Sequence, residues 1–117
     1  GRAVRDFIHA KDVAMGMLLV AEKMPEKPVN LGSGVGVSIK TLTEIIISNL
    51  TEKPEVLWDE SKARGDDQRI LNISRAKELG FEPKISLEQG IKETMDWYNE
   101  NKKISHLRYD IYDKLDS

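Results

Sequence analysis

The residues best suited to chemistry lie in a short β-type run near the start of the chain, residues 4–8. Side chains alternate between the two faces of a strand, so Arg5, Phe7 and His9 share one side while Asp6 lies on the other. An arginine, an aromatic ring and a histidine in one row can meet an anion attached to a flat group. His9 has three possible roles, as a satisfied core histidine, a substrate contact or a neighbour of a cofactor, and we favour the first.

A second candidate is the polar loop at residues 61–69, which contains Arg64 and Arg69. Its charge pattern alone indicates a solvated turn. Arg5 changes that interpretation, because two guanidinium groups from separate elements can grip a diphosphate. Such charge-assisted hydrogen bonds are often bidentate and contribute roughly 1.5–3 kcal/mol each when water is excluded. Together, Arg5 and this loop predict a diphosphate clamp.

A glycine-rich segment at residues 32–36 stands between an expected strand and an expected helix, the context of a dinucleotide-binding turn. Asp59 follows the next expected strand, where a ribose-binding acid would be sought. The spacing does not fit, because the third glycine should stand where Val37 does. A P-loop would need a Gly-Lys-Ser/Thr end that this segment lacks. We therefore expect an ordinary strand-to-helix turn.

Tyr98 and Lys102 match the Tyr-x-x-x-Lys pattern in which a lysine lowers the pKa of a catalytic tyrosine. Tyr98 also completes the apolar stripe of the last expected helix. No strands of a nucleotide-binding sheet precede it to bring a nicotinamide near. We interpret the pair as structural and predict no catalytic residue in this chain.

The elements that must position these residues can be read from periodicity and capping signals. Strands are expected at residues 4–8, 29–31 and 55–58, and an extended segment or short strand at residues 70–73. Four helices are expected. The first is capped by Asp12, carries Val13, Met17, Leu18 and Ala21 on one apolar stripe, and ends near Lys23. The second is capped by Ser38, the third by Ser74 with its end at Gly80, and the fourth by Ser86, with an extension over residues 104–111.

Length and composition limit the function classes. The chain has 117 residues, 39% hydrophobic and 32% charged, which allows one modest domain. A net charge of −2 and scattered basic residues argue against nucleic acid as the main partner. There is no apolar run of membrane-spanning length and no signal-peptide pattern, so we expect a cytoplasmic protein. The absence of cysteine excludes disulfides and thiolate metal sites, and no metal site is expected. The start at Gly1, directly before a strand, suggests a piece of a longer protein.

Several stretches, taken together and in order, resemble one known family. They are Val4-Arg5-Asp6-Phe7-Ile8-His9 with Asp12-Val13-Ala14, Val29-Asn30-Leu31-Gly32-Ser33-Gly34 with Val37-Ser38-Ile39, residues 62–69, Ile73-Ser74-Arg75-Ala76, Leu79-Gly80-Phe81-Glu82-Pro83, and Ser86-Leu87 with Gly90-Ile91 and Trp97-Tyr98. The set resembles the C-terminal part of extended short-chain dehydrogenases/reductases, the NAD(P)-dependent epimerases and dehydratases of nucleotide sugars. The loop at residues 62–69 and the segment Pro83-Lys84-Ile85-Ser86-Leu87 are most similar to members of the GDP-L-fucose synthase type.

The resemblance implies an α/β fold with few short strands and about four helices, the substrate-binding region of such an enzyme without its Rossmann half. Residues 1–103 would be the nucleotide-sugar-binding region and residues 104–117 a C-terminal tail that can be helical. Arg5 would bind the substrate phosphate, and either Arg69 or Arg64 would complete the clamp. In the complete enzyme the cofactor would be NAD or NADP, whereas none is expected to bind this chain alone. The missing half should leave apolar surface on the first helix and on residues 29–31 exposed.

Two other interpretations remain open from the sequence. The chain can be a stand-alone module that binds a nucleotide sugar, or that uses its apolar face to form a homo-oligomer, without enzyme activity. It can also be a small dinucleotide-binding domain built on residues 32–59. An independent start codon near Gly1 would support the stand-alone module over an enzyme fragment. Stabilisation of the isolated chain by NAD would support the dinucleotide-binding domain.

Overall fold

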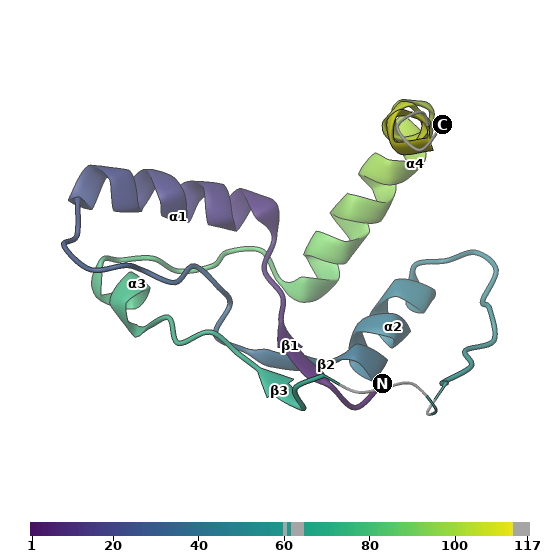
Figure 1. Cartoon of the computed structure of the whole chain (residues 1–117), viewed down its shortest axis with the longest axis horizontal. Helices are drawn as coiled ribbons and strands as arrows, with labels where there is room; N and C mark the ends of the chain where they lie inside the picture. The colour runs from purple at the N-terminus through teal and green to yellow at the C-terminus, as the bar shows by residue number, and fades with distance from the viewer. Residues whose placement is uncertain (60, 62–64, 114–117) are drawn as a thin grey trace.

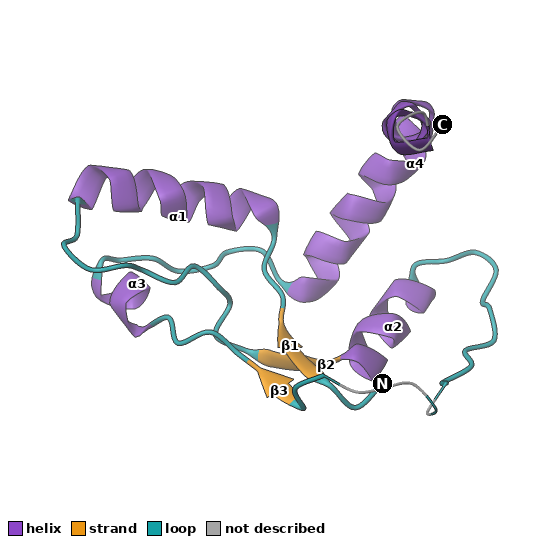
Figure 2. Ribbon diagram, in the orientation of Figure 1, coloured by secondary structure: helices purple, strands orange, loops and turns teal. Residues whose placement is uncertain are grey.

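The computed structural model describes the backbone of residues 1–59, 61 and 65–113, and the side chains up to residue 101. This part of the chain is mixed α/β, with one small sheet and four helices (Figures 1 and 2). The elements in order are β1 (Val4–Asp6), α1 (Ala10–Lys23), β2 (Gly36–Ser38), α2 (Ile39–Ser48), β3 (Gln68–Arg69), α3 (Ser74–Glu78) and α4 (Leu87–Asp113).

The sheet has the strand order β2-β1-β3, with β1 antiparallel to β2 and parallel to β3 (Figure 2). Its register places Arg5 opposite Val37 on one side and opposite Arg69 on the other. Directly opposed residues share a face of a sheet. The short central strand therefore brings together two arginines that are 64 positions apart in the sequence.

Two of the expected strands are wrong. Residues 29–31 are extended but join no ladder; Asn30 donates its side-chain amide to the carbonyl of Asn72 instead. Residues 55–58 also join no strand, and Leu57 is 84% exposed there. The positions beside β1 are taken by β2 and β3, which carry weaker β propensity. Pairing with β1, and not local composition, decides which segments become strands.

Helix α1 begins earlier than the sequence predicted. Its N-cap is His9, whose Nδ1 accepts a hydrogen bond from the Lys11 backbone N–H at 3.2 Å, and so Asp12 is not the cap. The helix ends at Lys23, as predicted. Asp12 and Gly16 are buried and mark the face of the helix that packs against the chain. The packing at Gly16 is tight, since a Cβ there would lie 2.8 Å from Leu31. Because glycine has no side chain, the helix can pack closely against residues 29–31.

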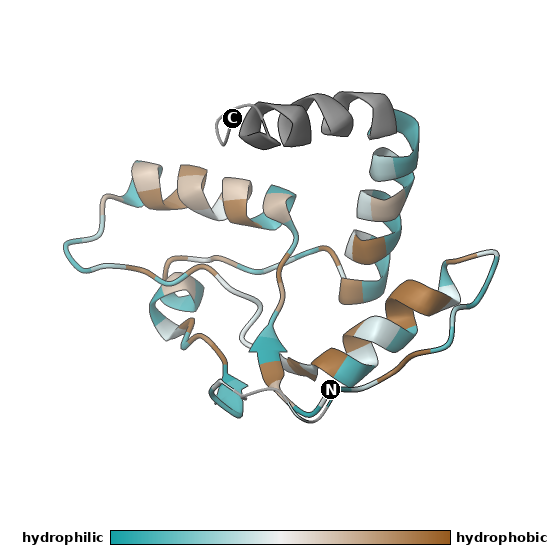
Figure 3. Cartoon of the chain, turned by 45° about the vertical axis from the view of Figure 1, so that its right-hand side comes forward, coloured by the Kyte–Doolittle hydropathy of each residue, from teal (hydrophilic) through white to brown (hydrophobic). Residues whose placement is uncertain are grey.

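The predicted apolar stripe of α1 is only partly covered by the rest of the described chain. Met17 and Leu18, two of its four members, are 62% and 65% exposed. The closely packed face is instead the one that carries Gly16. Met15 is also 63% exposed, so an apolar surface runs along the outside of this helix (Figure 3).

A small core lies between α1 and α3. Its buried side chains are Ile73, Ala76 and Phe81, and the partly buried ones around them are Ile8, Leu19, Val29 and Leu31. Ser74 was expected to cap α3, but it is the first helical residue, and Asn72 accepts from the Ser74 N–H and hydroxyl. Gly80 ends this turn with a φ of 97°, the left-handed conformation expected for it.

Helices α2 and α4 face each other on the other side of the molecule. The predicted caps are confirmed: Ser38 accepts from the Thr41 N–H at 3.0 Å, and Ser86 accepts from the Gln89 N–H at 3.2 Å. Helix α4 changes direction at Asn101, where φ is −113° and ψ is 16° (Figure 1). Its backbone stays helical to Asp113, in line with the expected extension, although the side chains of that part lie outside the described set.

The arrangement is open. The accessible surface is 9687 Å², whereas a compact monomer of this size exposes roughly 6,500 Å². The Cα radius of gyration is 17.5 Å, against roughly 13 Å for a compact domain of this length. Several turns of α1 and α2 are coloured hydrophobic in Figure 3, and Met15, Leu18 and Ile46 on these helices are exposed. The expected exposure of apolar surface on the first helix is thus observed. None of the helices described here is both long enough and apolar enough to cross a membrane.

Candidate functional site

Asp6 joins three separate segments at the end of β1. One carboxylate oxygen accepts hydrogen bonds from the Ser33 N–H at 2.8 Å and from the Ser33 hydroxyl at 2.6 Å. The other accepts from the Gly34 N–H at 2.9 Å and from the Leu71 N–H at 3.3 Å. A single side chain therefore ties the sheet to the glycine-rich turn and to the segment that follows β3.

These contacts also set the charge state of Asp6. Partial burial raises the pKa of its carboxyl group, but the hydrogen bonds from the Ser33 side chain, then from the backbone of Ser33, Gly34 and Leu71, together outweigh that effect. The pKa of Asp6 consequently lies below its ordinary value. Asp6 is an anion at neutral pH, and its charge is used within the chain.

The glycine-rich turn does not offer its amides to a cofactor phosphate. The Ser33 and Gly34 N–H groups point at Asp6, and a Cβ on Gly32 would lie 2.8 Å from the Asp6 carboxylate. Gly34 has a φ of 71°, and Gly36 leaves no room for a Cβ, which would lie 2.5 Å from Ile70. Each glycine has a packing reason, and the turn does not fit a dinucleotide pyrophosphate. This agrees with the expectation of an ordinary turn.

Arg5 lies beside the polar loop. Its guanidinium donates to the Val4 carbonyl at 2.8 Å, and a Cβ on Gly65 would lie 3.9 Å from Arg5 Nη2. The loop is fastened to β1 by a hydrogen bond of 2.8 Å from the Val4 N–H to the Asp67 carbonyl. Arg5 and the loop are therefore neighbours, as the clamp hypothesis requires.

Arg69 closes the same loop and stands opposite Arg5 in the sheet. Its guanidinium forms an ion pair with Asp66 at 2.6 Å, in which both side chains are largely exposed. The alternative clamp residue, Arg64, lies outside the residues that the structure describes. Of the two candidates, only Arg69 can be placed beside Arg5.

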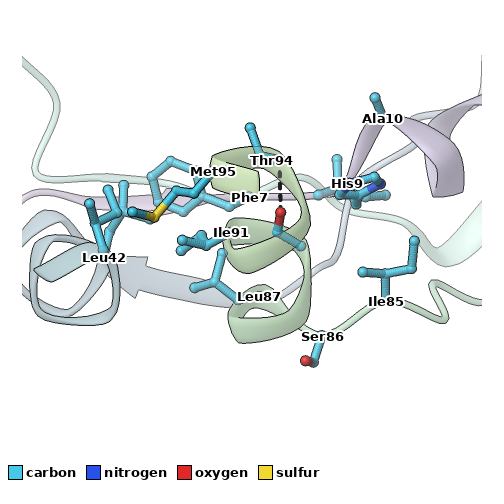
Figure 4. Close-up of a pocket in the computed structure, with 13 residues that line it drawn as sticks. Phe7, His9, Ala10, Leu42, Ile85, Ser86, Leu87, Ile91, Thr94 and Met95 are labelled. Atoms are coloured by element: carbon cyan, nitrogen blue, oxygen red, sulfur yellow. Dashed lines mark hydrogen bonds between the residues drawn. The ribbon is translucent and has the colours of Figure 1, made fainter. Parts of the chain in front are cut away.

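Phe7 and His9 belong to a different place, an apolar cavity of about 330 Å³ between the end of β1 and the helices α2 and α4 (Figure 4). Its other principal lining side chains are Leu42, Ile46, Ile85, Leu87, Ile91 and Met95. Arg5 and Arg69 are not among the described residues that line it. The strand ends at Asp6, so the predicted row of Arg5, Phe7 and His9 is divided between two sites.

His9 has a structural role in this arrangement. His9 caps α1, and its side chain is only 14% exposed. Its Nε2 lies 3.9 Å from a carboxylate oxygen of Glu93. Gly90 allows the approach, because a Cβ there would lie 3.1 Å from the His9 ring. Lys11 also pairs with Glu93 at 3.0 Å. These contacts join α1 to α4 and agree with the satisfied histidine that we favoured.

Two further predictions concern the Tyr98–Lys102 motif and metal binding. Tyr98 is 51% exposed and does not complete a buried stripe, and the side chain of Lys102 lies beyond the described set. Among the residues that the structure describes, no group of three or more histidines and acidic residues is placed to hold a metal ion.

Sequence reasoning missed the roles of two aspartates. The sequence placed Asp6 only on the strand face opposite Arg5, and it marked Asp12 only as a helix cap. In the structure Asp12 is buried, and it accepts hydrogen bonds from the backbone N–H groups of Lys84 and Ile85 at 3.1 and 3.0 Å. Both carboxylates satisfy amides of distant loops. The one available signal was an acidic residue within a β-type run beside an unexplained glycine-rich turn.

The comparisons with known proteins agree on one group of enzymes. A family model described as GDP-mannose 4,6 dehydratase matches residues 1–94. A putative GDP-L-fucose synthase of Arabidopsis thaliana is 35% identical over 102 residues, which cover 86% of this chain and 31% of that protein. A solved UDP-glucose 4-epimerase of Thermotoga maritima with UDP-glucose is 31% identical, with a TM-score of 0.71, and the match covers 86% of this chain and 33% of that one.

A dTDP-glucose 4,6-dehydratase of Bacillus anthracis, solved in complex with NAD, gives a TM-score of 0.73 at 27% identity, covering 88% of this chain and 33% of that one. The chain thus spans about a third of the length of the relatives it matches. These relatives include epimerases, dehydratases and reductases of nucleotide sugars. The chain belongs to the GDP-mannose 4,6-dehydratase family, among the epimerases and dehydratases of the short-chain dehydrogenase/reductase type.

Proposed function

We propose that residues 1–103 form the nucleotide-sugar-binding region of an NAD(P)-dependent epimerase, dehydratase or reductase. Arg5 and Arg69 bind the diphosphate of the substrate, and Arg64, the second loop arginine, is the alternative partner of Arg5. Residues 104–117 are a C-terminal tail outside this region. The region is a piece of the enzyme that lacks the Rossmann half and does not catalyse alone.

The observation that carries this proposal is the register of β1 and β3, which puts Arg5 and Arg69 opposite each other on one face. Like charges in that position repel each other, so an anion bound between them would remove an unfavourable contact. A diphosphate is wide enough to be held by two planar guanidinium groups. The solved relatives support the same ligand class. One of them was solved with UDP-glucose, and another was solved with NAD⁺ and UDP.

In the complete enzyme this region would act by orientation. A hydride passes between a nicotinamide and a sugar carbon in the reaction that we infer, and a fixed diphosphate places that carbon in reach. The cofactor, NAD or NADP, is bound by the part of the enzyme that this chain does not span. The packing of the glycine-rich turn around Asp6 supports that division of labour.

A second candidate is a stand-alone binding or dimerisation module. The observation in its favour is the exposed apolar face of α1, with Met15 and Leu18 more than 60% exposed. The same face would equally contact the Rossmann half of a complete enzyme. The two candidates therefore share the nucleotide-sugar site and differ in what covers α1.

A thermal-shift titration of this chain tests the ligand class. UDP-glucose, GDP-mannose and dTDP-glucose would be compared with NAD and NADP, since a ligand that binds the folded form raises its melting temperature. The proposal predicts a rise with at least one nucleotide sugar and none with the dinucleotides. A rise with NAD or NADP alone would instead favour the dinucleotide-binding interpretation and overturn the proposed function.

A further inference from the structure

We propose that Asp6 is the positioning residue of the arginine pair: it holds β3 in the register that sets Arg69 opposite Arg5. The inference rests on the proposed function, since it concerns how the diphosphate site is assembled. Asp6 is not itself a ligand contact. It acts through the backbone of the two strands that carry the arginines.

The β1–β3 ladder is too short to fix its own register. It contains only two registered pairs, Val4 with Gln68 and Arg5 with Arg69. A strand of two residues has few hydrogen bonds of its own to resist slipping. A slip by one residue would turn Arg69 to the opposite face of the sheet, because side chains alternate along a strand. Some other contact must fix the register.

Asp6 supplies that contact on the far side of Arg69. Its carboxylate accepts from the N–H of Leu71, two residues beyond Arg69, while the Val4 N–H binds the carbonyl of Asp67, two residues before it. The short strand is therefore held at both ends. The Asp6 end is in turn anchored to the turn at Ser33 by two further hydrogen bonds of 2.8 and 2.6 Å.

A direct role for Asp6 in binding does not fit its surroundings. It alternates with Arg5 along β1, so it faces the other side of the sheet. Both carboxylate oxygens already accept hydrogen bonds from Ser33, Gly34 and Leu71. A bare carboxylate beside a diphosphate would repel it, whereas Asp6 is turned away and surrounded by donors.

The test compares Asp6→Asn with Asp12→Asn in the full chain. Asp12 is a matched control, because it is also a carboxylate that accepts from two backbone N–H groups, but it ties α1 to the segment before α4. Two quantities are measured: the affinity for UDP-glucose and GDP-mannose, and the cross-strand nuclear Overhauser contacts between Arg5 and Arg69. We expect Asp6→Asn to lose those contacts and about tenfold in affinity, and Asp12→Asn to keep both.

A double-mutant cycle with Arg69→Ala separates positioning from general destabilisation. If Asp6 acts by placing Arg69, then Asp6→Asn should cost much less affinity, under about threefold, once Arg69 is gone. An equal loss in both backgrounds, or an intact Arg5–Arg69 contact in Asp6→Asn, overturns the inference. If Asp6→Asn does not fold, Ser33→Ala decides: a loss of about threefold that disappears with Arg69→Ala supports it, and unchanged affinity overturns it.

Failure of the proposed function would look different. If the unaltered chain binds neither nucleotide sugar, the proposed function of this chain is contradicted. The Overhauser contacts still decide the positioning role, because they need no ligand: their loss in Asp6→Asn supports it, and their retention overturns it. If Asp6→Asn does not fold, the same contacts in Ser33→Ala decide in the same way.

Discussion

Arg5 and Arg69 stand at directly opposite positions on neighbouring strands, where like charges destabilise a sheet. Asp66 offsets part of that repulsion by pairing with Arg69 at 2.6 Å. In the unliganded chain, Asp66 therefore takes a place on the guanidinium that a diphosphate oxygen would need. A ligand must compete with this internal carboxylate.

Replacing Asp66 by Asn should strengthen nucleotide-sugar binding. The amide keeps the size of the side chain but removes the competing charge. Because an exposed ion pair contributes about 0.2–1 kcal/mol, the expected gain in affinity is roughly 1.4- to fivefold, measured by isothermal titration with UDP-glucose and GDP-mannose. Asp96→Asn, which breaks the exposed pair with Lys92 on α4, is the matched control and should leave affinity unchanged. Weaker binding in Asp66→Asn would show that Asp66 supports the site.

Single residues were predicted unevenly from the sequence. Arg5 and the basic loop could be singled out because guanidinium chemistry is evident from residue type. That Arg69 stands opposite Arg5 could not be predicted, since the pairing joins positions 64 apart and depends on the register of a two-residue strand. The role of Asp6 was hidden for the same reason: its partners Ser33 and Leu71 are 27 and 65 positions away.

At the scale of elements, two aspartates hold short segments in place, as longer strand ladders do in larger sheets. Asp6 fastens three short segments, and Asp12 fastens the start of α1 to residues 84 and 85. Each accepts hydrogen bonds from backbone amides that would otherwise lack partners near the core. The short strands keep their places through these side chains.

The stabilising effect of the Asp6 cluster should depend on pH. The folded-state pKa of Asp6 is lowered, so its contribution is fully present above the unfolded-state pKa and disappears as the pH falls through the folded value. Ser33→Ala removes one hydrogen bond to the carboxylate. The difference in free energy of unfolding between the unaltered chain and Ser33→Ala should therefore be larger at pH 7 than at pH 3, measured by urea denaturation.

The control for that experiment is Ser48→Ala, which removes a serine hydroxyl that donates to the Ile45 carbonyl and to no carboxylate. Its effect on the free energy of unfolding should be the same at both pH values. An Ser33→Ala effect that is equally independent of pH would contradict the role assigned to the ionised carboxylate.

Helices were predicted better than strands. The caps at Ser38 and Ser86 are local signals within a few residues of sequence, and both are confirmed. The strands expected at residues 29–31 and 55–58 have suitable composition but no partner in the sheet. Strand formation depends on distant neighbours, so composition alone selected the wrong segments.

At the scale of the whole molecule, the open shape leaves the outer face of α1 without cover from the described residues. Periodicity marks the apolar positions of α1 without saying which face of the helix packs. Gly16 decides it by allowing close approach on one side. The other face carries Met15 and Leu18.

This exposed face should make the isolated chain self-associate. Leu18→Lys should reduce the apparent mass in sedimentation or light scattering and change the free energy of unfolding by less than about 0.5 kcal/mol, because the side chain is 65% exposed. Leu57→Lys, at an even more exposed leucine away from α1, should leave the apparent mass unchanged. Equal association of all three proteins would contradict an interface on α1.

The most direct test of the central claim is the affinity of UDP-glucose and GDP-mannose for Arg5→Ala, Arg69→Ala and the double variant. Each single change should cost roughly 1.5–3 kcal/mol, or about 10- to 150-fold, with little selectivity among sugars. The double variant should lose less than the sum, since both side chains bind one diphosphate. Arg75→Ala is the control, because that guanidinium binds the Pro28 carbonyl on the α3 side. Nucleotide-sugar affinity that is the same in every variant would contradict the diphosphate clamp.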